Sequence, residues 1–128
     1  AIDTEACKLV KSRVERIYKP STNDLTVIGV SHSNNVFPAH SWDGARIVLE
    51  HGHDGADLAL ERVLATENVE ARFDEVVIVS GDGMFANQAA RLRSLGVRVT
   101  VDTRARQLSR VLAFSCTSVS LTPTLLAA

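Results

Sequence analysis

Residues 76–83 read VVIVSGDG, so four apolar residues run directly into a short polar turn. An unbroken apolar run rich in β-branched residues indicates a strand that is covered on both faces, as in parallel sheets. Similar runs occur at residues 25–30, 45–49 and 97–101, and residues 118–122 are predicted to form a last edge strand. The chain therefore contains the strands of a mostly parallel sheet.

Helical spacing of apolar residues fills the segments between these strands. The predicted helices cover residues 5–19, 57–65, 85–95 and 105–113. Because strands alternate with helices, we predict an α/β fold, a three-layer sandwich around one central, mostly parallel sheet. The sequence shows no linker and no internal repeat, so residues 1–128 are expected to form a single domain.

The composition is that of an ordinary globular protein. Of the 128 residues, 45% are hydrophobic and 23% are charged, which excludes a disordered chain and a collagen-like repeat. Two cysteines, Cys7 and Cys116, are too few for a disulfide framework, so a reducing, cytoplasmic environment is expected. No 18-residue apolar run and no signal-peptide pattern is present, so no membrane association is expected.

The formal net charge of −1 conceals a segregation of charge along the chain. Residues 50–82 carry nine acids and two bases, whereas residues 83–128 carry six arginines and a single acid. The field around a protein depends on such local excesses as well as on the total. Near-neutrality therefore does not exclude a polyanionic partner.

Several acids fall where an α/β sheet binds its ligands, beyond the carboxyl ends of the strands. Asp82 and Asp102 each follow a predicted strand, and Asp3 follows the short apolar stretch Ala1-Ile2. Asp57 falls in the first turn of a predicted helix. Carboxylates that converge at one rim repel each other unless a cation neutralises them, and oxygen ligands suit Mg²⁺ or Mn²⁺. From spacing alone, a metal site and ordinary turn or helix-start acids are both open interpretations.

The local sequence narrows this choice. VVIVSGDGMF at residues 76–85 and LRSLGVRV at 92–99, with DGADLAL at 54–60 and AIDTE at 1–5, resemble the core motifs of NYN domains, which belong to the PIN-like ribonuclease superfamily. The resemblance implies a PIN-like, Rossmann-like topology and a metal-dependent endoribonuclease. In such an enzyme, clustered aspartates hold Mg²⁺ or Mn²⁺, and a metal-activated water cleaves a phosphodiester bond of RNA.

The resemblance also implies roles for individual acidic and small polar residues. The positions that match the acidic metal site of the family, and are expected to be catalytic, are Asp3, Asp57 and Asp82. The residues expected to support them are Ser80, Glu5 and Asp54, with Asp102 as a further candidate metal ligand.

Two positions depart from the family pattern. Met84 stands where the family commonly has the second Asp of Ser-Gly-Asp-x-Asp, and Ala6 stands where it commonly has Asn. Loss of one carboxylate weakens a metal site. The alternative function is therefore a catalytically degenerate PIN-like domain that binds RNA or a protein partner without cutting.

Basic residues follow two of the candidate acids in the sequence. Arg104, Arg106 and Arg110 come shortly after Asp102, while Lys8 and Lys11 come shortly after Asp3, at the other end of the chain. Arginine binds phosphate well, often through two parallel hydrogen bonds, so these residues are candidates for binding RNA. The alternative is that they lie on ordinary solvated helix faces. Besides RNA, a homodimer or a protein partner is an expected possibility.

Two further patterns have alternative interpretations. Residues 51–54 (HGHD) have the residue types of a zinc site but lack the rest of a zinc signature. Residues 80–83 (SGDG) could hold a nucleotide phosphate at a strand-to-helix turn, although an acid in the turn argues against it. The irregular stretch 31–44 is long enough to contact a ligand.

Overall fold

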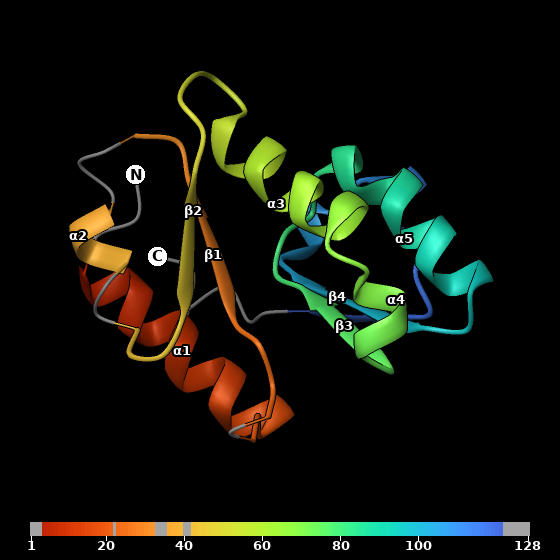
Figure 1. Cartoon of the computed structure of the whole chain (residues 1–128), viewed down its shortest axis with the longest axis horizontal. Coiled ribbons are helices and arrows are strands. Elements are labelled where there is room, and N and C mark those ends of the chain that lie inside the picture. Colours follow the sequence, from red (N-terminus) through yellow and green to blue (C-terminus); the bar gives the residue numbers. More distant parts are fainter. Residues whose placement is uncertain (1–3, 22, 33–35, 40–41, 122–128) are drawn as a thin grey trace. The chain divides into compact units, whose positions relative to one another are not determined.

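The computed structural model describes residues 4–21, 23–32, 36–39 and 42–121 (Figure 1). The chain forms two compact units, one up to Leu60 and one from Glu61 onward. Among the described residues, none of the helices combines the length and the apolar character needed to cross a bilayer.

The first unit is built on a pair of parallel strands. Its elements are α1 (Thr4–Tyr18), β1 (Val27–Val30), α2 (Val36–Ala39), β2 (Arg46–Leu49) and the first half of α3 (Gly55–Thr66). Val27 of β1 lies opposite Arg46 of β2, and α2 contacts both strands. A Cβ at Gly29 of β1 would collide with the Ala56 carbonyl oxygen and lie 2.7 Å from Leu60 Cγ. The start of α3 therefore packs directly on β1.

The second unit contains a three-stranded parallel sheet in the order β3-β4-β5. Its strands are β3 (Glu75–Ile78), β4 (Arg98–Thr103) and β5 (Ser118–Leu121). The remaining elements are the second half of α3, α4 (Val69–Arg72), α5 (Ala86–Ser94), α6 (Arg110–Ser115) and the 3-10 turns η2 (Gly83–Phe85) and η3 (Ala105–Gln107). Each strand thus runs parallel to the next and is reached by a helical crossover.

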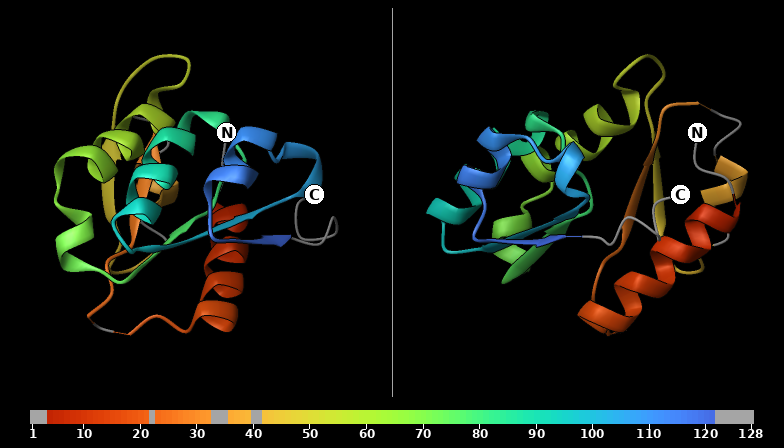
Figure 2. Two further views of the ribbon diagram at one scale, coloured as in Figure 1. Left: turned by 90° about the vertical axis from the view of Figure 1, so that its right-hand side faces the viewer. Right: turned by 180° about the vertical axis from the view of Figure 1, so that it is seen from behind.

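Helices α5 and α6 lie on the same side of this sheet (Figure 2). Leu92 of α5 and Leu112 of α6 are completely buried, as are Val99 and Val101 of β4. Phe85, at the end of η2, is buried with them. Burial of each such side chain contributes about 1.5–3 kcal/mol, so this apolar layer is the main source of stability in the second unit.

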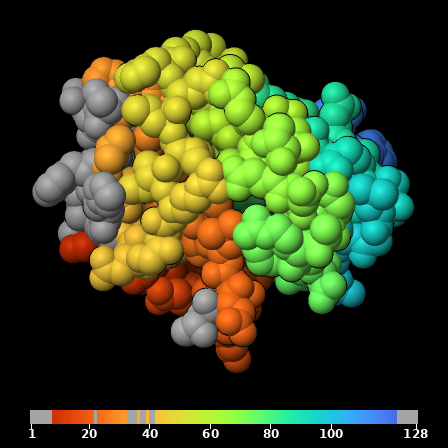
Figure 3. All heavy atoms as spheres, in the orientation of Figure 1, coloured from red at the N-terminus to blue at the C-terminus, as the bar shows by residue number. Residues whose placement is uncertain are grey.

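Arg91 joins three helices of the second unit through its guanidinium group. Its Nε donates to Gln88 Oε1 (2.8 Å), one NH₂ group donates to Glu70 Oε1 of α4 (3.1 Å), and the other donates to the Leu64 carbonyl of α3 (2.7 Å). These bonds fix the second half of α3 and the single turn of α4 to α5. Residues of α3 and α4, yellow-green to green, lie at the surface in Figure 3.

The α/β class and the parallel strands predicted from the sequence are confirmed. The described strands pair as two sheets instead of the one central sheet expected, so the three-layer arrangement and the single domain stay predictions. The helix predicted over 105–113 is instead η3 followed by α6, because the Ser109 N–H donates to the Gly81 carbonyl (2.8 Å) outside any helix. The single-turn helices α2 and α4 were not predicted, since one turn carries too little periodicity to recognise.

Candidate functional site

Asp82 lies in the turn that leads from β3 into η2. Its Oδ1 accepts a hydrogen bond from the Met84 N–H (2.9 Å), and its own N–H donates to Ser80 Oγ (3.2 Å). These two bonds fix the turn and cap η2, as an aspartate before a helical turn commonly does. Within the described residues, Oδ2 of this exposed carboxylate accepts no hydrogen bond. Asp82 is therefore held in place by one oxygen and offers the other to solvent.

Gly81 allows the segment before α6 to lie directly against this turn. A Cβ at Gly81 would collide with the backbone carbonyl oxygen of Gln107, and the Gly81 carbonyl accepts the Ser109 N–H. At Gly83, a Cβ would lie 2.9 Å from Ser109 Oγ and 3.2 Å from Val111 Cγ1. The first turn of α6 is therefore packed beside the turn that carries Asp82.

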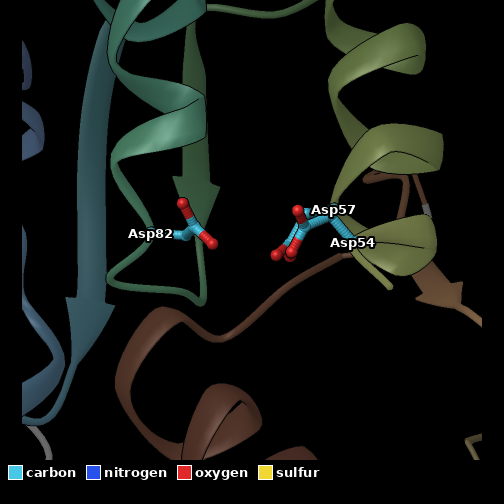
Figure 4. A group of neighbouring side chains, drawn as sticks. All are labelled: Asp54, Asp57 and Asp82. Carbon is cyan, nitrogen blue, oxygen red and sulfur yellow. The ribbon is translucent and has the colours of Figure 1, made fainter. Parts of the chain in front are cut away.

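Asp54 and Asp57 lie together at the start of α3, in the first unit (Figure 4). One carboxylate oxygen of each lies within 4.8 Å of the other. Asp57 is half-buried in the first helical turn, where an acid is favoured by the helix dipole, and Asp54 is exposed just before the helix. Two carboxylates this close repel each other and so favour binding of a cation.

Figure 4 also shows Asp82, which follows β3 in the second unit. Ser80, a predicted supporting residue, bonds to the Asp82 backbone as described above. Met84 is half-buried, and its N–H donates to Asp82 Oδ1, so this position adds a backbone donor to the turn and no carboxylate.

The sequence predicted that Asp102 follows the strand over 97–101, and this prediction is wrong. It lies inside β4, opposite Ser120 of β5, and is only 1% exposed. The strand continues to Thr103 because pairing with β5 extends it beyond the apolar run, which sequence patterning could not reveal. Asp102 is thus a buried residue of the sheet interior, and its role as a metal ligand stays a prediction.

The remaining predicted residues are described in part. Asp3 lies outside the described residues, and Glu5 is in α1 with a side chain that is also outside them. Lys8 is exposed on α1, and Lys11 forms an ion pair with Glu15 one turn later, at 3.4 Å.

The predicted RNA-binding arginines lie along the stretch from the end of β4 to the first residue of α6. Arg106 and Arg110 are exposed, and Arg104 is partly exposed. No acidic residue occurs after Asp102 in the sequence, so no carboxylate side chain within this C-terminal segment neutralises them. The segment is therefore a basic surface beside the Asp82 turn.

The histidines give little support to a zinc site. The His53 side chain is fully exposed, with its Nε2 3.7 Å from Asp54 Oδ1, and the rings of His32 and His51 meet edge to face at 6.5 Å. Among the described side chains, no group of three potential metal ligands includes a histidine.

Comparison with known proteins identifies a sequence family and a similar solved structure. The sequence model of the NYN domain family matches residues 16–121. The crystal structure of a protein of unknown function from Vibrio parahaemolyticus is similar, with a TM-score of 0.57 and 17% sequence identity. The match covers 91% of this chain and 88% of that chain, and at this identity it supports the fold alone. No curated protein sequence matches.

Proposed function

Because the chain belongs to the NYN domain family, whose members are PIN-like nuclease domains, we propose that it is a metal-dependent endoribonuclease. The observation that carries the proposal is the acid set at the positions of the family motifs. Asp54 and Asp57 form a close pair at the start of α3, and Asp82 presents an oxygen to solvent after β3. Asp3 is the remaining member of the proposed set and is assigned from the sequence.

The donor chemistry of these residues fits Mg²⁺ or Mn²⁺. All the proposed ligands are carboxylate oxygens, which hard divalent cations prefer, and a pair of nearby carboxylates requires neutralisation. When bound, such an ion would lower the pKa of a water molecule and stabilise charge on the phosphate. Asp57, Asp82 and Asp3 are the proposed direct ligands, and Asp54 is proposed to assist Asp57.

The fold contributes to this proposal through α3. Asp57 lies one helical turn before Glu61, whose Oε1 accepts a hydrogen bond from Gln88 Nε2 of α5 (3.3 Å). Arg91 of α5 also donates to the Leu64 carbonyl of α3. The second half of α3 is therefore held to α5 within the second unit. From the family motifs, we propose that Asp57 and Asp82 act on one phosphodiester.

The chain's own side chains would position the substrate. Arg106 and Arg110 are exposed and are free to take phosphates, whose charge suits the forked guanidinium group. Ser80 Oγ holds the backbone of the Asp82 turn and the Met84 N–H holds Asp82 Oδ1, which leaves Oδ2 for a metal ion. No covalent intermediate with the protein is required.

A second function is favoured by Met84. Since this position adds no carboxylate, the acid set is smaller than the family pattern provides, and a domain that binds RNA without cutting it is the competing function. The two functions make opposite predictions for cleavage and the same prediction for binding.

The test is cleavage of a labelled single-stranded RNA with Mn²⁺, with Mg²⁺ and with EDTA. We expect metal-dependent cleavage that Asp82→Asn lowers at least about 100-fold, since loss of even an indirect metal contact commonly costs 10–100-fold. Asp74→Asn is the matched control, because Asp74 is an exposed acid before the opposite end of β3. Intact RNA with both metals, together with retained RNA binding, would establish the competing function.

Metal binding itself provides a readout that does not depend on activity. Titration of Mn²⁺, followed by the loss of the free-ion signal in electron paramagnetic resonance, should show binding to the wild type and to Asp74→Asn. Asp82→Asn and Asp57→Asn should bind at least tenfold more weakly. Equal affinity in all four proteins would place the metal elsewhere and refute the assignment.

A further inference from the structure

Phe114 is the most exposed large apolar side chain in the described part of the chain. It lies on α6 with 82% of its surface exposed to solvent. The opposite side of α6 is buried, because Leu112, two residues before Phe114, and Cys116, directly after the helix, are both buried. The Phe114 ring therefore faces solvent, where it is available for stacking against a flat ligand.

The neighbours of Phe114 on α6 are exposed and basic or apolar. Arg110 precedes it by four residues and Val111 by three, so all three side chains project from one face of the helix. Val111 is 55% exposed. Arg93 of α5 donates to the Phe114 carbonyl (3.4 Å) and the Cys116 carbonyl (3.3 Å), which places a further guanidinium group at the end of α6.

The positive charge of this face of α6 favours a negatively charged ligand. Arg106 and Arg110 are exposed at its beginning, Arg93 lies at its end, and the sequence has no acid after Asp102. A ligand that complements it must carry negative charge together with a flat apolar group. Single-stranded nucleic acid has this combination, since phosphates alternate with bases that stack on aromatic side chains.

We propose that Phe114 is a stacking platform for an unpaired base of RNA, with Arg110 and Arg106 binding the adjacent phosphates. The proposal rests on the proposed ribonuclease function and specifies its substrate as single-stranded RNA. Val111 of α6 and Ser109, the residue before α6, both pack against Gly83. Gly83 directly follows Asp82, so the platform begins beside a proposed catalytic residue. A base on Phe114 would thus hold the strand a short distance from the phosphate that is cut.

A protein partner fits the same face less well. Phe114 and Val111 are the exposed large apolar side chains of α6, and they are bordered by arginines rather than by a wider apolar area. Stable protein interfaces usually bury about 800 Å² on each partner around an apolar centre. Stacking of a base requires only one ring and its charged border.

The test measures binding of a fluorescent single-stranded RNA and of the matching duplex to the full chain in EDTA, where cleavage is absent. Phe114→Ala should weaken single-strand binding about five- to 100-fold, the range for loss of one stacked base. Phe114→Trp should restore binding, while Phe114→Leu should not, because leucine keeps the apolar area without a ring face. Leu95→Ala is the control and should bind as the wild type does, because Leu95 is an exposed apolar residue at the end of α5, outside this face.

Three outcomes would overturn the proposal. Wild-type affinity of Phe114→Ala would show that no base stacks there. Full affinity of Phe114→Leu would show that apolar area alone matters. Weaker self-association of Phe114→Ala, with unchanged RNA binding, would assign the face to a second copy of the chain.

The outcome is separable from that of the proposed function. If cleavage fails but Phe114→Ala still loses single-strand binding, the platform stands and the chain is a binding domain. If cleavage succeeds and Phe114→Ala binds and cuts as the wild type does, only the platform is refuted.

Discussion

Replacing Gly81 by alanine tests whether the turn before Asp82 packs directly against the backbone of Gln107 and Leu108. The added methyl group would collide with the Gln107 carbonyl oxygen and lie 3.0 Å from the Leu108 nitrogen. Both atoms belong to the backbone, so no side-chain rotation can relieve the collision. The segment between η3 and α6 must move away from the turn that precedes Asp82.

The energetic cost follows from the contacts that this movement breaks. Overpacking by one methyl group typically costs about 1–3 kcal/mol. Movement of the segment also stretches the bond from the Ser109 N–H to the Gly81 carbonyl, now 2.8 Å, which contributes about 0.5–1.5 kcal/mol. We therefore expect Gly81→Ala to lower the free energy of unfolding by about 2–4 kcal/mol, or the Tm by about 10 °C.

The assay is urea unfolding followed by circular dichroism, with Gly83→Ala as the matched control. At Gly83 the nearest atoms are Ser109 Oγ at 2.9 Å and Val111 Cγ1 at 3.2 Å, which belong to side chains that can rotate. Gly83→Ala should therefore cost less than about 1 kcal/mol. The reasoning is refuted if Gly81→Ala is as stable as the wild type, or if both variants lose the same stability.

Three further outcomes are expected. Leu92→Ala should lower the free energy of unfolding by about 2–5 kcal/mol in the same assay, because Leu92 is fully buried; a loss below 1 kcal/mol would contradict the packing of α5. A backbone hydrogen bond and then the Arg91 guanidinium hold the pKa of Glu70 below its usual 4.5, so the stability advantage of the wild type over Glu70→Gln should be complete above pH 4.5. It should vanish as the pH falls through that lowered pKa, and a pH-independent difference would contradict this linkage. Mn²⁺ at about 100 times its Kd should stabilise the wild type by about 2.7 kcal/mol in thermal unfolding and Asp82→Asn far less; equal stabilisation would remove Asp82 from the proposed ligands.

Sequence patterning predicted the second unit best where local signals coincide. The run at 76–79, the polar turn and the helical spacing of 85–95 all act over a few residues, and β3, η2 and α5 follow them closely. The break at Ser109 could not be predicted, because it depends on a hydrogen bond to Gly81, 28 residues earlier in the sequence. The apolar spacing of residues 105–113 alone indicates an uninterrupted helix.

In the candidate site too, features set by nearby residues could be predicted, whereas features set by residues distant in the sequence could not. The approach of Asp54 to Asp57 follows from three residues of sequence separation at a helix start, so it was accessible to sequence reasoning. The burial of Asp102 depends on its pairing with Ser120, which no pattern near Asp102 reveals. The exposure of Phe114 was not predicted, because the helix expected over 105–113 ended one residue before it, whereas α6 runs to Ser115.

The parallel arrangement of every described strand pair has a consequence for how the chain folds. Val27 and Arg46 are 19 residues apart, Glu75 and Arg98 are 23, and Thr100 and Ser118 are 18, so among the described strands no hairpin can form first. Each sheet must close a long loop before it gains a strand pair, which slows folding. During synthesis, β1 and β2 are both available once residue 49 has emerged, whereas the three-stranded sheet of the second unit is complete only when β5, whose last residue is Leu121, has emerged. The apolar strands of the second unit are therefore the part of the nascent chain that depends longest on protection from aggregation.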